Sequence, residues 1–219
     1  MRRGLFITFE GSEGCGKSTQ VQRLAARLTA AGQQVLLTRE PGGTPIGEKI
    51  RHLLQFDAVG AAMHPETELL LFEASRSQLV REVIRPALEQ GQLVISDRFY
   101  DSTTVYQGVA RKLDPQTVQQ LNAFAVGDCR PDLTILLEVD VATARARMLR
   151  RVRPVSSTPD RMEQEPVEFY ERVCAAYHEL AEREPERVHC IDGSGSPDEI
   201  EARIWKLAQS AISNQQSAI

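Results

Sequence analysis

The sequence lacks several patterns, and each absence excludes a class of protein. Its four cysteines (Cys15, Cys129, Cys174 and Cys190) form no C-x-x-C pair, so neither a thiolate metal site nor a disulfide framework is predicted. The four histidines are scattered, without the spacing of metal ligands. No apolar run is long enough to span a bilayer, and Glu10 interrupts the first apolar stretch, which is not typical of a secretory signal. We therefore expect a cytoplasmic protein with reduced thiols.

Lysine is also scarce, and acidic residues outnumber basic ones by 30 to 26. Lysine occurs only at positions 17, 49, 112 and 206, and the net charge is -4, which disfavours general affinity for nucleic acids. The chain has no Asn/Thr-Lys-x-Asp motif of the kind that reads guanine, so a GTP-dependent switch is disfavoured. With 219 residues and an ordinary apolar fraction of 42%, it is long enough for one compact domain with a large core.

The most informative segment is Gly11–Ser18, Gly-Ser-Glu-Gly-Cys-Gly-Lys-Ser, which fits the phosphate-binding spacing G-x-x-x-x-G-K-[ST]. Glycines let the backbone curl so that successive N–H groups point at one concave spot, and a helix that starts there adds its positive end. Lys17 would bring a full charge to the outer phosphates, and the Ser18 hydroxyl would help to hold Mg²⁺. The motif predicts a nucleoside triphosphate or a similar ligand.

The residues on either side of this motif supply the strand and the helix that it requires. Leu5–Phe9 is rich in strand formers, and Val21–Leu28 carries apolar residues with the spacing of one helix face. Gly32 stands where a helix-ending glycine is expected. The alternative, a glycine-rich turn beside a surface lysine, does not account for this order of strand, loop and helix.

Strand-like and helix-like segments alternate along the rest of the chain. Strands are predicted at 34–37, 93–96, 133–139 and 189–191, and helices at 46–55, 66–90, 102–109, 115–126, 142–151, 168–183 and 199–212, with Pro86 kinking or dividing the longest. This alternation favours an α/β fold of the P-loop NTPase type, with a central parallel sheet of about five strands between two layers of helices. Ligands of such folds bind at the carboxyl ends of the strands.

Charged residues follow two of the predicted strands at that edge. Asp97 and Arg98 come directly after strand 93–96, where a carboxylate can hold Mg²⁺ and an arginine can grip phosphate in a bidentate fork. Arg39 follows strand 34–37 and suits a second phosphate. A surface ion pair and an ordinary loop arginine are the alternatives for these residues.

Two further patterns suit contacts with ligands. Phe72 and Arg76 lie four apart on one helix, as stacking on a nucleobase and bonding to its edge would require, although the spacing alone favours a core Phe beside a solvated Arg. Arginines 145, 147, 150, 151 and 153 run into a Pro/Ser-rich loop. They suit a mobile lid that reaches the transferring phosphoryl group, the alternative being a solvated basic helix face.

Taken together, these motifs resemble bacterial thymidylate kinase, which phosphorylates dTMP to dTDP with ATP. The resemblance extends from about residue 4 to residue 192, and it is carried by residues 9–19, 38–43, 97–99, 102–103, 106–108, 130–132 and 160–163. The Arg-Glu-Pro-Gly-Gly and Tyr-Gln-Gly segments are quite specific to this family, whereas the phosphate loop is shared more widely.

The resemblance implies two adjoining sites. The ATP site would comprise Gly11, Ser12, Glu13, Gly14, Cys15, Gly16, Lys17, Ser18 and Thr19, with Ser18 and Asp97 toward Mg²⁺. The dTMP site would comprise Arg39, Phe72, Arg76, Arg98, Ser102, Thr103, Tyr106 and Gln107. In the family pattern, the arginines at 39 and 98 hold the acceptor phosphate, Phe72 stacks on thymine, and residues 76, 103 and 107 hydrogen-bond to the base edge. Glu13 and Tyr106 lie against the sugar.

The resemblance also bears on the catalytic residues. The family draws a catalytic arginine either from the phosphate loop or from the lid, and this loop has none. The lid, at about residues 150–161, would supply it, with Arg153 as first choice and Arg151 as second. This stretch looks longer than the common lid and lacks its usual Arg-Gly pair, so the choice between them stays open. Lys17, Arg98 and Glu13 complete the predicted catalytic set.

We therefore expect one kinase domain over residues 1–212, followed by a flexible polar tail at 213–219. As in the family, it would be a homodimer acting on dTMP and ATP for dTTP synthesis, without nucleic-acid or membrane partners. Alternatives are a kinase for another nucleoside monophosphate or nucleoside, a nucleotide-dependent switch, and a structural protein without turnover.

Overall fold

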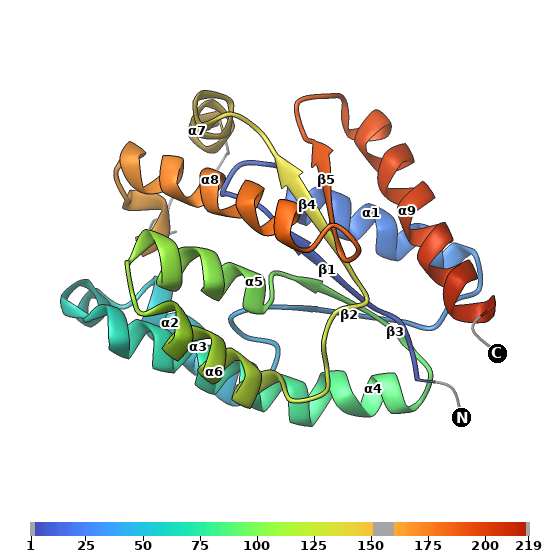
Figure 1. Cartoon of the computed structure of the whole chain (residues 1–219), viewed down its shortest axis with the longest axis horizontal. Helices are drawn as coiled ribbons and strands as arrows, with labels where there is room; N and C mark the ends of the chain where they lie inside the picture. Colours follow the sequence, from blue (N-terminus) through green and yellow to red (C-terminus); the bar gives the residue numbers. More distant parts are fainter. Residues whose placement is uncertain (1–2, 151–159, 218–219) are drawn as a thin grey trace.

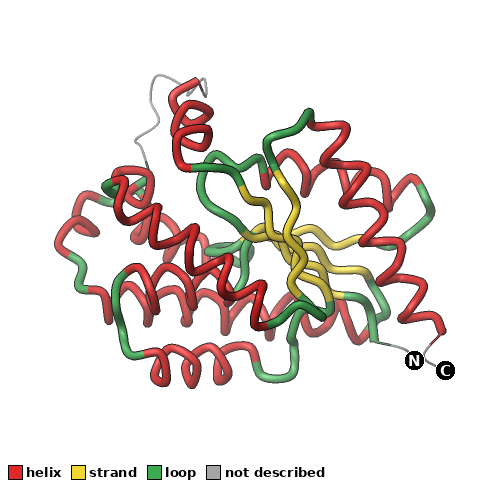
Figure 2. The backbone as a smooth tube through the Cα atoms, turned by 45° about the horizontal axis from the view of Figure 1, so that its top comes forward, coloured by secondary structure: helices red, strands yellow, loops and turns green. Residues whose placement is uncertain are grey.

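The computed structural model describes residues 3–150 and 160–217, which form a single parallel sheet with helices on both sides (Figures 1 and 2). The strands are β1 (Phe6–Glu10), β2 (Val35–Arg39), β3 (Leu93–Asp97), β4 (Leu133–Glu138) and β5 (Val188–Asp192), in the order β2-β3-β1-β4-β5. The predicted three-layer α/β fold is confirmed. With β1 in the centre, the loop after it lies between the ends of β3 and β4.

The helices are α1 (Lys17–Ala30), α2 (Pro45–Gln55), α3 (Pro65–Leu79), α4 (Arg85–Glu89), α5 (Tyr100–Thr103), α6 (Pro115–Val126), α7 (Val141–Arg150), α8 (Val167–Arg183) and α9 (Pro197–Ser217). Short 3₁₀ segments η1 (Ala58–Ala62) and η4 (Arg161–Gln164) and π-helical segments η2 (Val80–Ile84) and η3 (Thr104–Ala110) complete them. Thr44 and Asp114 cap α2 and α6, each followed by a proline. None of the described helices has the length and apolarity to cross a membrane.

Apolar side chains pack against both faces of the sheet. On β1, Ile7 and Phe9 join the cluster that includes residues of α1 and α9, while Phe6 packs on the opposite face against η2 and α4. A third cluster connects β4 with η3 and α8. In Figure 1, α1 and α9 accordingly cover one side of the sheet, and α3 to α6 and α8 cover the other.

Two helical segments differ from those expected. The predicted helix 66–90 is interrupted by the π-helical turn η2, which precedes Pro86 in the first turn of α4. Since proline has no N–H to give to the residue four positions earlier, the helix widens before it. At the other end of the chain, α9 continues to Ser217, so residues 213–217, which we expected in a polar tail, are helical. Gln215 donates to the carbonyl of Arg3, so the two ends of the described chain lie together.

Candidate active site

The phosphate loop connects β1 to α1 in a conformation that requires glycine. Gly11 and Gly14 have φ values of 133° and 78°, and a Cβ atom at either would come within 2.3 Å of a backbone oxygen. Lys17 is buried within the loop, where Nζ donates to the carbonyls of Gly11 at 2.9 Å and Ser12 at 3.0 Å. Its charge and the N-terminus of α1 therefore favour an anion at the same place.

The two predicted metal ligands meet at the adjoining strand end. Ser18, in the first turn of α1, donates from Oγ to Oδ2 of Asp97 at 2.8 Å. This closeness follows from the parallel register, which sets the end of β3 beside β1. The described residues contain no group of three or more His, Cys, Asp or Glu side chains that could hold a metal ion. A cation here would need further oxygen ligands, from phosphate or water.

Arg98 joins the phosphate loop to the predicted dTMP site. Its backbone is left-handed, with a φ of 71°, a conformation that costs about 1 kcal/mol outside glycine. Nη1 donates to Gly11 O and Ser102 Oγ, each at 3.0 Å, and Nη2 donates to Oε1 of Glu13 at 2.7 Å. Tyr106 donates to the other oxygen of Glu13 at 2.7 Å. Five predicted site residues thus form one hydrogen-bonded group.

Beneath this group lies a buried acid that the sequence analysis did not assign. Glu10 accepts from Phe99 N at 2.8 Å, Ser102 Oγ at 2.6 Å and the Tyr177 hydroxyl at 2.8 Å. Burial raises the pKa of Glu10, and the nearby charge of Asp101 raises it further. Glu10 lies in the segment 9–19 that carries the family resemblance, at the end of β1, but no role was assigned to it, and Tyr177 on α8 has no sequence signal.

A cavity of about 640 Å³ opens along this edge of the sheet, a volume typical of small-molecule sites. The predicted residues that line it are Glu13, Gly14, Gly16, Lys17, Ser18, Thr19, Arg39, Phe72, Asp97, Arg98, Ser102, Thr103, Tyr106 and Gln107. Gly11, Ser12 and Cys15 belong to the loop but not to this lining. Arg151 and Arg153, the candidates for a catalytic lid arginine, lie outside the described residues. The residues predicted to bind the phosphates and those predicted to bind the base therefore share one cavity.

Two arginines line the cavity near the Pro-Gly-Gly loop. Arg39, at the end of β2, donates from Nη2 to both oxygens of Glu48, and Glu48 in turn accepts from Gly43 N at 2.8 Å. Arg51, on α2, donates to the carbonyl of Pro41 at 2.9 Å and was not predicted. Burial lowers the pKa of Arg51, and the charge of Arg39 lowers it further. Arg39, the cation expected at this edge of the sheet, therefore lies near a second cation, Arg51.

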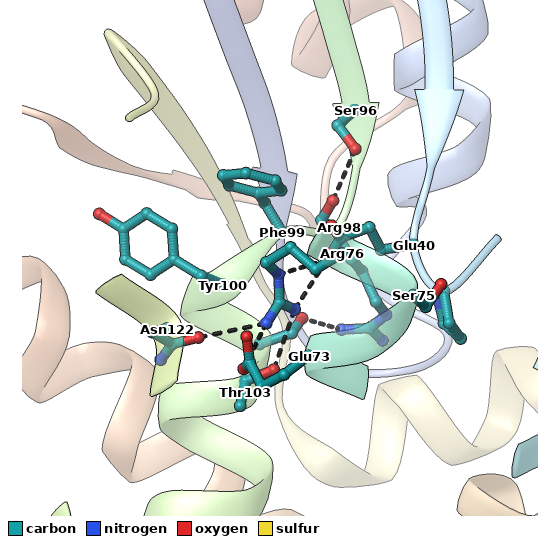
Figure 3. Close-up of polar contacts among 12 residues, drawn as sticks. Glu40, Glu73, Ser75, Arg76, Ser96, Arg98, Phe99, Tyr100, Thr103 and Asn122 are labelled. Carbon is teal, nitrogen blue, oxygen red and sulfur yellow. Dashed lines mark hydrogen bonds and ion pairs between the residues drawn. The ribbon is translucent and has the colours of Figure 1, made fainter. Parts of the chain in front are cut away.

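The guanidinium of Arg76, which was predicted to contact the base edge, is bound by other side chains of the protein (Figure 3). Its side chain is 1% exposed and does not line the cavity. Nε and Nη2 donate to Glu40 at 2.9 and 2.7 Å, and Nη1 donates to Glu73 at 2.6 Å and Asn122 at 3.2 Å. The remaining Nη2 donor reaches Thr103 Oγ1 at 2.9 Å. All five guanidinium donors therefore have protein acceptors.

Two buried carboxylates share this one guanidinium. Burial raises the pKa of Glu40 to about 7 and also raises that of Glu73, although Arg76 lowers both. Oε1 of Glu40 and Oε2 of Glu73 are buried without a hydrogen-bond partner in the part of the chain that the structure describes. The cluster therefore carries a net negative charge that a proton can neutralise near neutral pH.

Comparison with known proteins identifies the family. A family model described as thymidylate kinase matches residues 9–204. The chain is 50% identical over 206 residues to the thymidylate kinase of Geobacter sulfurreducens, covering 94% of this chain and 95% of that one. It is 47% identical over 205 residues to that of Deinococcus radiodurans, with 94% and 96% covered. A crystal structure of thymidylate kinase from Ehrlichia chaffeensis matches it with a TM-score of 0.76 at 34% identity, covering 94% of this chain and 99% of that chain. The chain belongs to the thymidylate kinase family.

Proposed function

We propose that the protein transfers the γ-phosphoryl group of ATP to the 5′-phosphate of dTMP, giving dTDP and ADP for dTTP synthesis. The observation that carries this proposal is the single cavity that runs from Lys17 and Ser18 to Phe72 and Gln107. It offers a triphosphate site and an aromatic ring for a second nucleotide within one enclosure. Membership of the thymidylate kinase family agrees with this reaction.

Charge neutralisation is the main task in such a reaction, because two polyanions must approach each other. The cavity supplies cations on both sides of the phosphate loop: Lys17 from α1, Arg39 from β2, Arg51 from α2 and Arg98 after β3. Glu13 and Tyr106 hold the guanidinium of Arg98 in one orientation. No general base is required, since the accepting phosphate oxygen is already ionised.

Ser18 and Asp97 fit the binding of Mg²⁺. Both offer the hard oxygen ligands that this ion prefers, and they lie 2.8 Å apart beside the phosphate loop. Mg²⁺ commonly binds proteins through one or two side chains and completes its shell with water and substrate phosphates. When bound, the ion would neutralise phosphate charge. We propose that Ser18 and Asp97 hold it, and that Asp97 also orients its waters.

The acceptor nucleotide would extend from Arg98 toward α3. Glu13 and Tyr106, joined by a hydrogen bond, would face the deoxyribose, and Phe72 would stack on the base. Thr103 and Gln107 line the cavity where the base edge would lie. The contact of Arg76 with that edge stays a prediction, and it would require one of the Arg76 donors to leave its protein acceptor.

The adenine of ATP would lie near α7. Arg147 lines the cavity and donates from Nη1 to the carbonyl of Gly193 at 2.8 Å, which connects α7 to the segment after β5. We propose that Arg153 or Arg151, in the adjoining lid segment, supplies the catalytic arginine that the phosphate loop lacks. We also propose a cytoplasmic homodimer, as is usual in the family.

Coupled measurement of ADP release tests this function. With Mg²⁺ and ATP, we expect dTMP to stimulate release strongly, dUMP less, and dCMP, dAMP and dGMP least. Release that dTMP does not increase would refute the proposal. A preference for one of the other monophosphates would instead favour the alternative kinase.

A further inference from the structure

Glu68 on α3 does not line the cavity but is bonded to Gln107, which does, and it has no role in the proposed function so far. Its side chain is 1% exposed. Oε1 accepts from Nε2 of Gln107 at 2.7 Å and from Nε of Arg111 at 3.2 Å. Oε2 accepts from Nη2 of Arg111 at 3.3 Å and from Nη2 of Arg161. The carboxylate thus anchors a predicted base-contacting side chain to two arginines.

This environment keeps Glu68 ionised. Burial alone would raise its pKa, but Arg111, Gln107 and Arg161 lower it below its ordinary value. An ionised carboxylate only accepts hydrogen bonds, so it must face the NH₂ group of the Gln107 amide. The other end of that amide, Oε1, is then directed away from Glu68. Gln107 lines the cavity, and no described residue donates to its Oε1.

Arg76 imposes the opposite polarity on Thr103, one helical turn earlier. A guanidinium only donates, so Thr103 Oγ1 accepts from Arg76 at 2.9 Å (Figure 3), and its hydroxyl proton is left for an acceptor in the cavity. Thr103 and Gln107 lie four residues apart and both line the cavity. The buried guanidinium of Arg76 therefore leaves the Thr103 hydroxyl as a donor, and the buried carboxylate of Glu68 leaves Gln107 Oε1 as an acceptor.

We propose that Glu68 is a positioning residue that selects a 4-oxopyrimidine base, thymine or uracil, against cytosine, by holding Gln107 Oε1 toward the cavity. A 4-oxopyrimidine presents an N3–H donor beside the O4 acceptor, which matches this pair. Cytosine presents an N3 acceptor beside an amino donor. Its N3 would then face the acceptor Gln107 Oε1, and its amino group would face the donor Thr103 hydroxyl. The role rests on the proposed function, and it does not separate thymine from uracil.

The test compares kcat/KM for dTMP, dUMP and dCMP in the wild type, Glu68→Gln and Glu165→Gln. Glu165 is the matched control, because it also pairs with Arg111, at 2.5 Å, and is bonded to Arg111 rather than to Gln107. A glutamine at 68 can present either end of its amide, so Gln107 is no longer held in one orientation. We expect the ratio of kcat/KM for dTMP to that for dCMP to fall about tenfold, the worth of one hydrogen bond, through KM rather than kcat.

The same change should lower the dUMP to dCMP ratio in parallel, and Glu165→Gln should leave both ratios within twofold of the wild type. The proposal would be overturned if Glu68→Gln keeps the wild-type ratios, which includes the case in which kcat/KM falls by the same factor for dTMP, dUMP and dCMP. Wild-type protein that does not turn over dTMP would refute the proposed function instead, so the two failures are distinguishable.

A double-mutant cycle with Gln107→Met completes the test. Methionine keeps the length of the side chain but has no amide, so this variant should lose the same discrimination while Glu68 stays paired with Arg111 and Arg161. Adding Glu68→Gln to it should then change the ratios no further. Additive losses would show that Glu68 acts otherwise than through Gln107. If Glu68→Gln does not fold, Gln107→Met alone decides whether the amide reads the base, and an unchanged ratio overturns the proposal.

Discussion

At the scale of single residues, Lys17 is the cation held most closely by the phosphate loop, with Nζ bonded to the carbonyls of Gly11 and Ser12. We predict that Lys17→Ala lowers kcat by about 10³-fold, as removal of a catalytic cation does in phosphoryl transfer. Lys49→Ala is the control, because that lysine is exposed on α2. Steady-state ADP release measures both, and thermal unfolding checks that the variants fold. Similar activities in the two variants would contradict the assignment.

Phe72 is the aromatic ring that lines the base end of the cavity. Stacking on an aromatic side chain contributes about 1–3 kcal/mol per base, so Phe72→Ala should raise KM for dTMP roughly tenfold or more and change kcat little. Phe56→Ala, at the end of α2, is the control for loss of a ring elsewhere. Initial rates across a range of dTMP concentrations separate the two constants. A fall in kcat at constant KM would argue against stacking.

Glu40 makes stability depend on pH in a predictable direction. Burial raises its pKa to about 7 in the folded protein, above the ordinary 4.5, so the folded state binds this proton more tightly than the unfolded state. Its contribution is therefore complete below pH 4.5 and is lost as pH rises through 7. Glu40→Gln cannot ionise, so between pH 4.5 and 8 the free energy of unfolding should shift by about 3 kcal/mol in its favour relative to the wild type.

Urea unfolding of both proteins at several pH values measures this difference, and other carboxylates cancel in the comparison. Glu48→Gln changes the exposed partner of Arg39 and is the control. The difference between its free energy of unfolding and that of the wild type should stay constant across the same pH range. Parallel curves for the wild type and Glu40→Gln would mean that Arg76 keeps Glu40 ionised throughout.

At the scale of elements, the sequence was sufficient where the signal is local. β3 and β4 are short apolar runs beside turn residues, and α2 and α6 begin at a capping side chain followed by proline. The π-helical turns η2 and η3 have no such signal, because a widened turn depends on packing against neighbouring elements. The extension of α9 was missed because polar residues give its last turns no apolar face.

The same distinction applies to the site. Parallel strands collect their end residues at one edge, so Arg39, Asp97 and Arg98 could be predicted from their positions after strands. Tyr177 and Glu68 could not, because their hydrogen-bond partners lie far away in the sequence. For Arg76, the spacing from Phe72 predicts a shared helix face but says nothing of the buried acids that bind it.

The helix α7 carries Arg147 and Arg150 to the cavity, and the predicted lid segment follows it in the sequence. Because the phosphate loop contains no arginine, we predict that Arg153→Ala lowers kcat by about 10³-fold, with Arg151→Ala as the second candidate. Arg145→Ala is the control, since that residue is exposed on α7 and does not line the cavity. Single-turnover rates measure the effect on chemistry. Normal rates in both lid variants would refute a lid-supplied arginine.

At the scale of the whole molecule, α3 and α6 pack against each other (Figure 1), and each has a large apolar side chain exposed to solvent. Leu70 on α3 is 55% exposed and Phe124 on α6 is 75% exposed. The homodimer that we propose from the family would cover this surface. Phe124→Glu should then shift the protein to monomer in sedimentation velocity. In a two-fold symmetric interface, the introduced carboxylate would be buried once from each subunit.

Leu149→Glu provides the control for this shift, since Leu149 is an equally apolar, 85% exposed residue on α7. It should sediment like the wild type. One chain supplies Lys17, Phe72 and Gln107 to the cavity, so we expect the Phe124→Glu monomer to keep kcat for dTMP within a few-fold of the dimer. A wild type that sediments as a monomer at all concentrations would refute the dimer. A dissociated variant without activity would instead show that the partner chain completes the site.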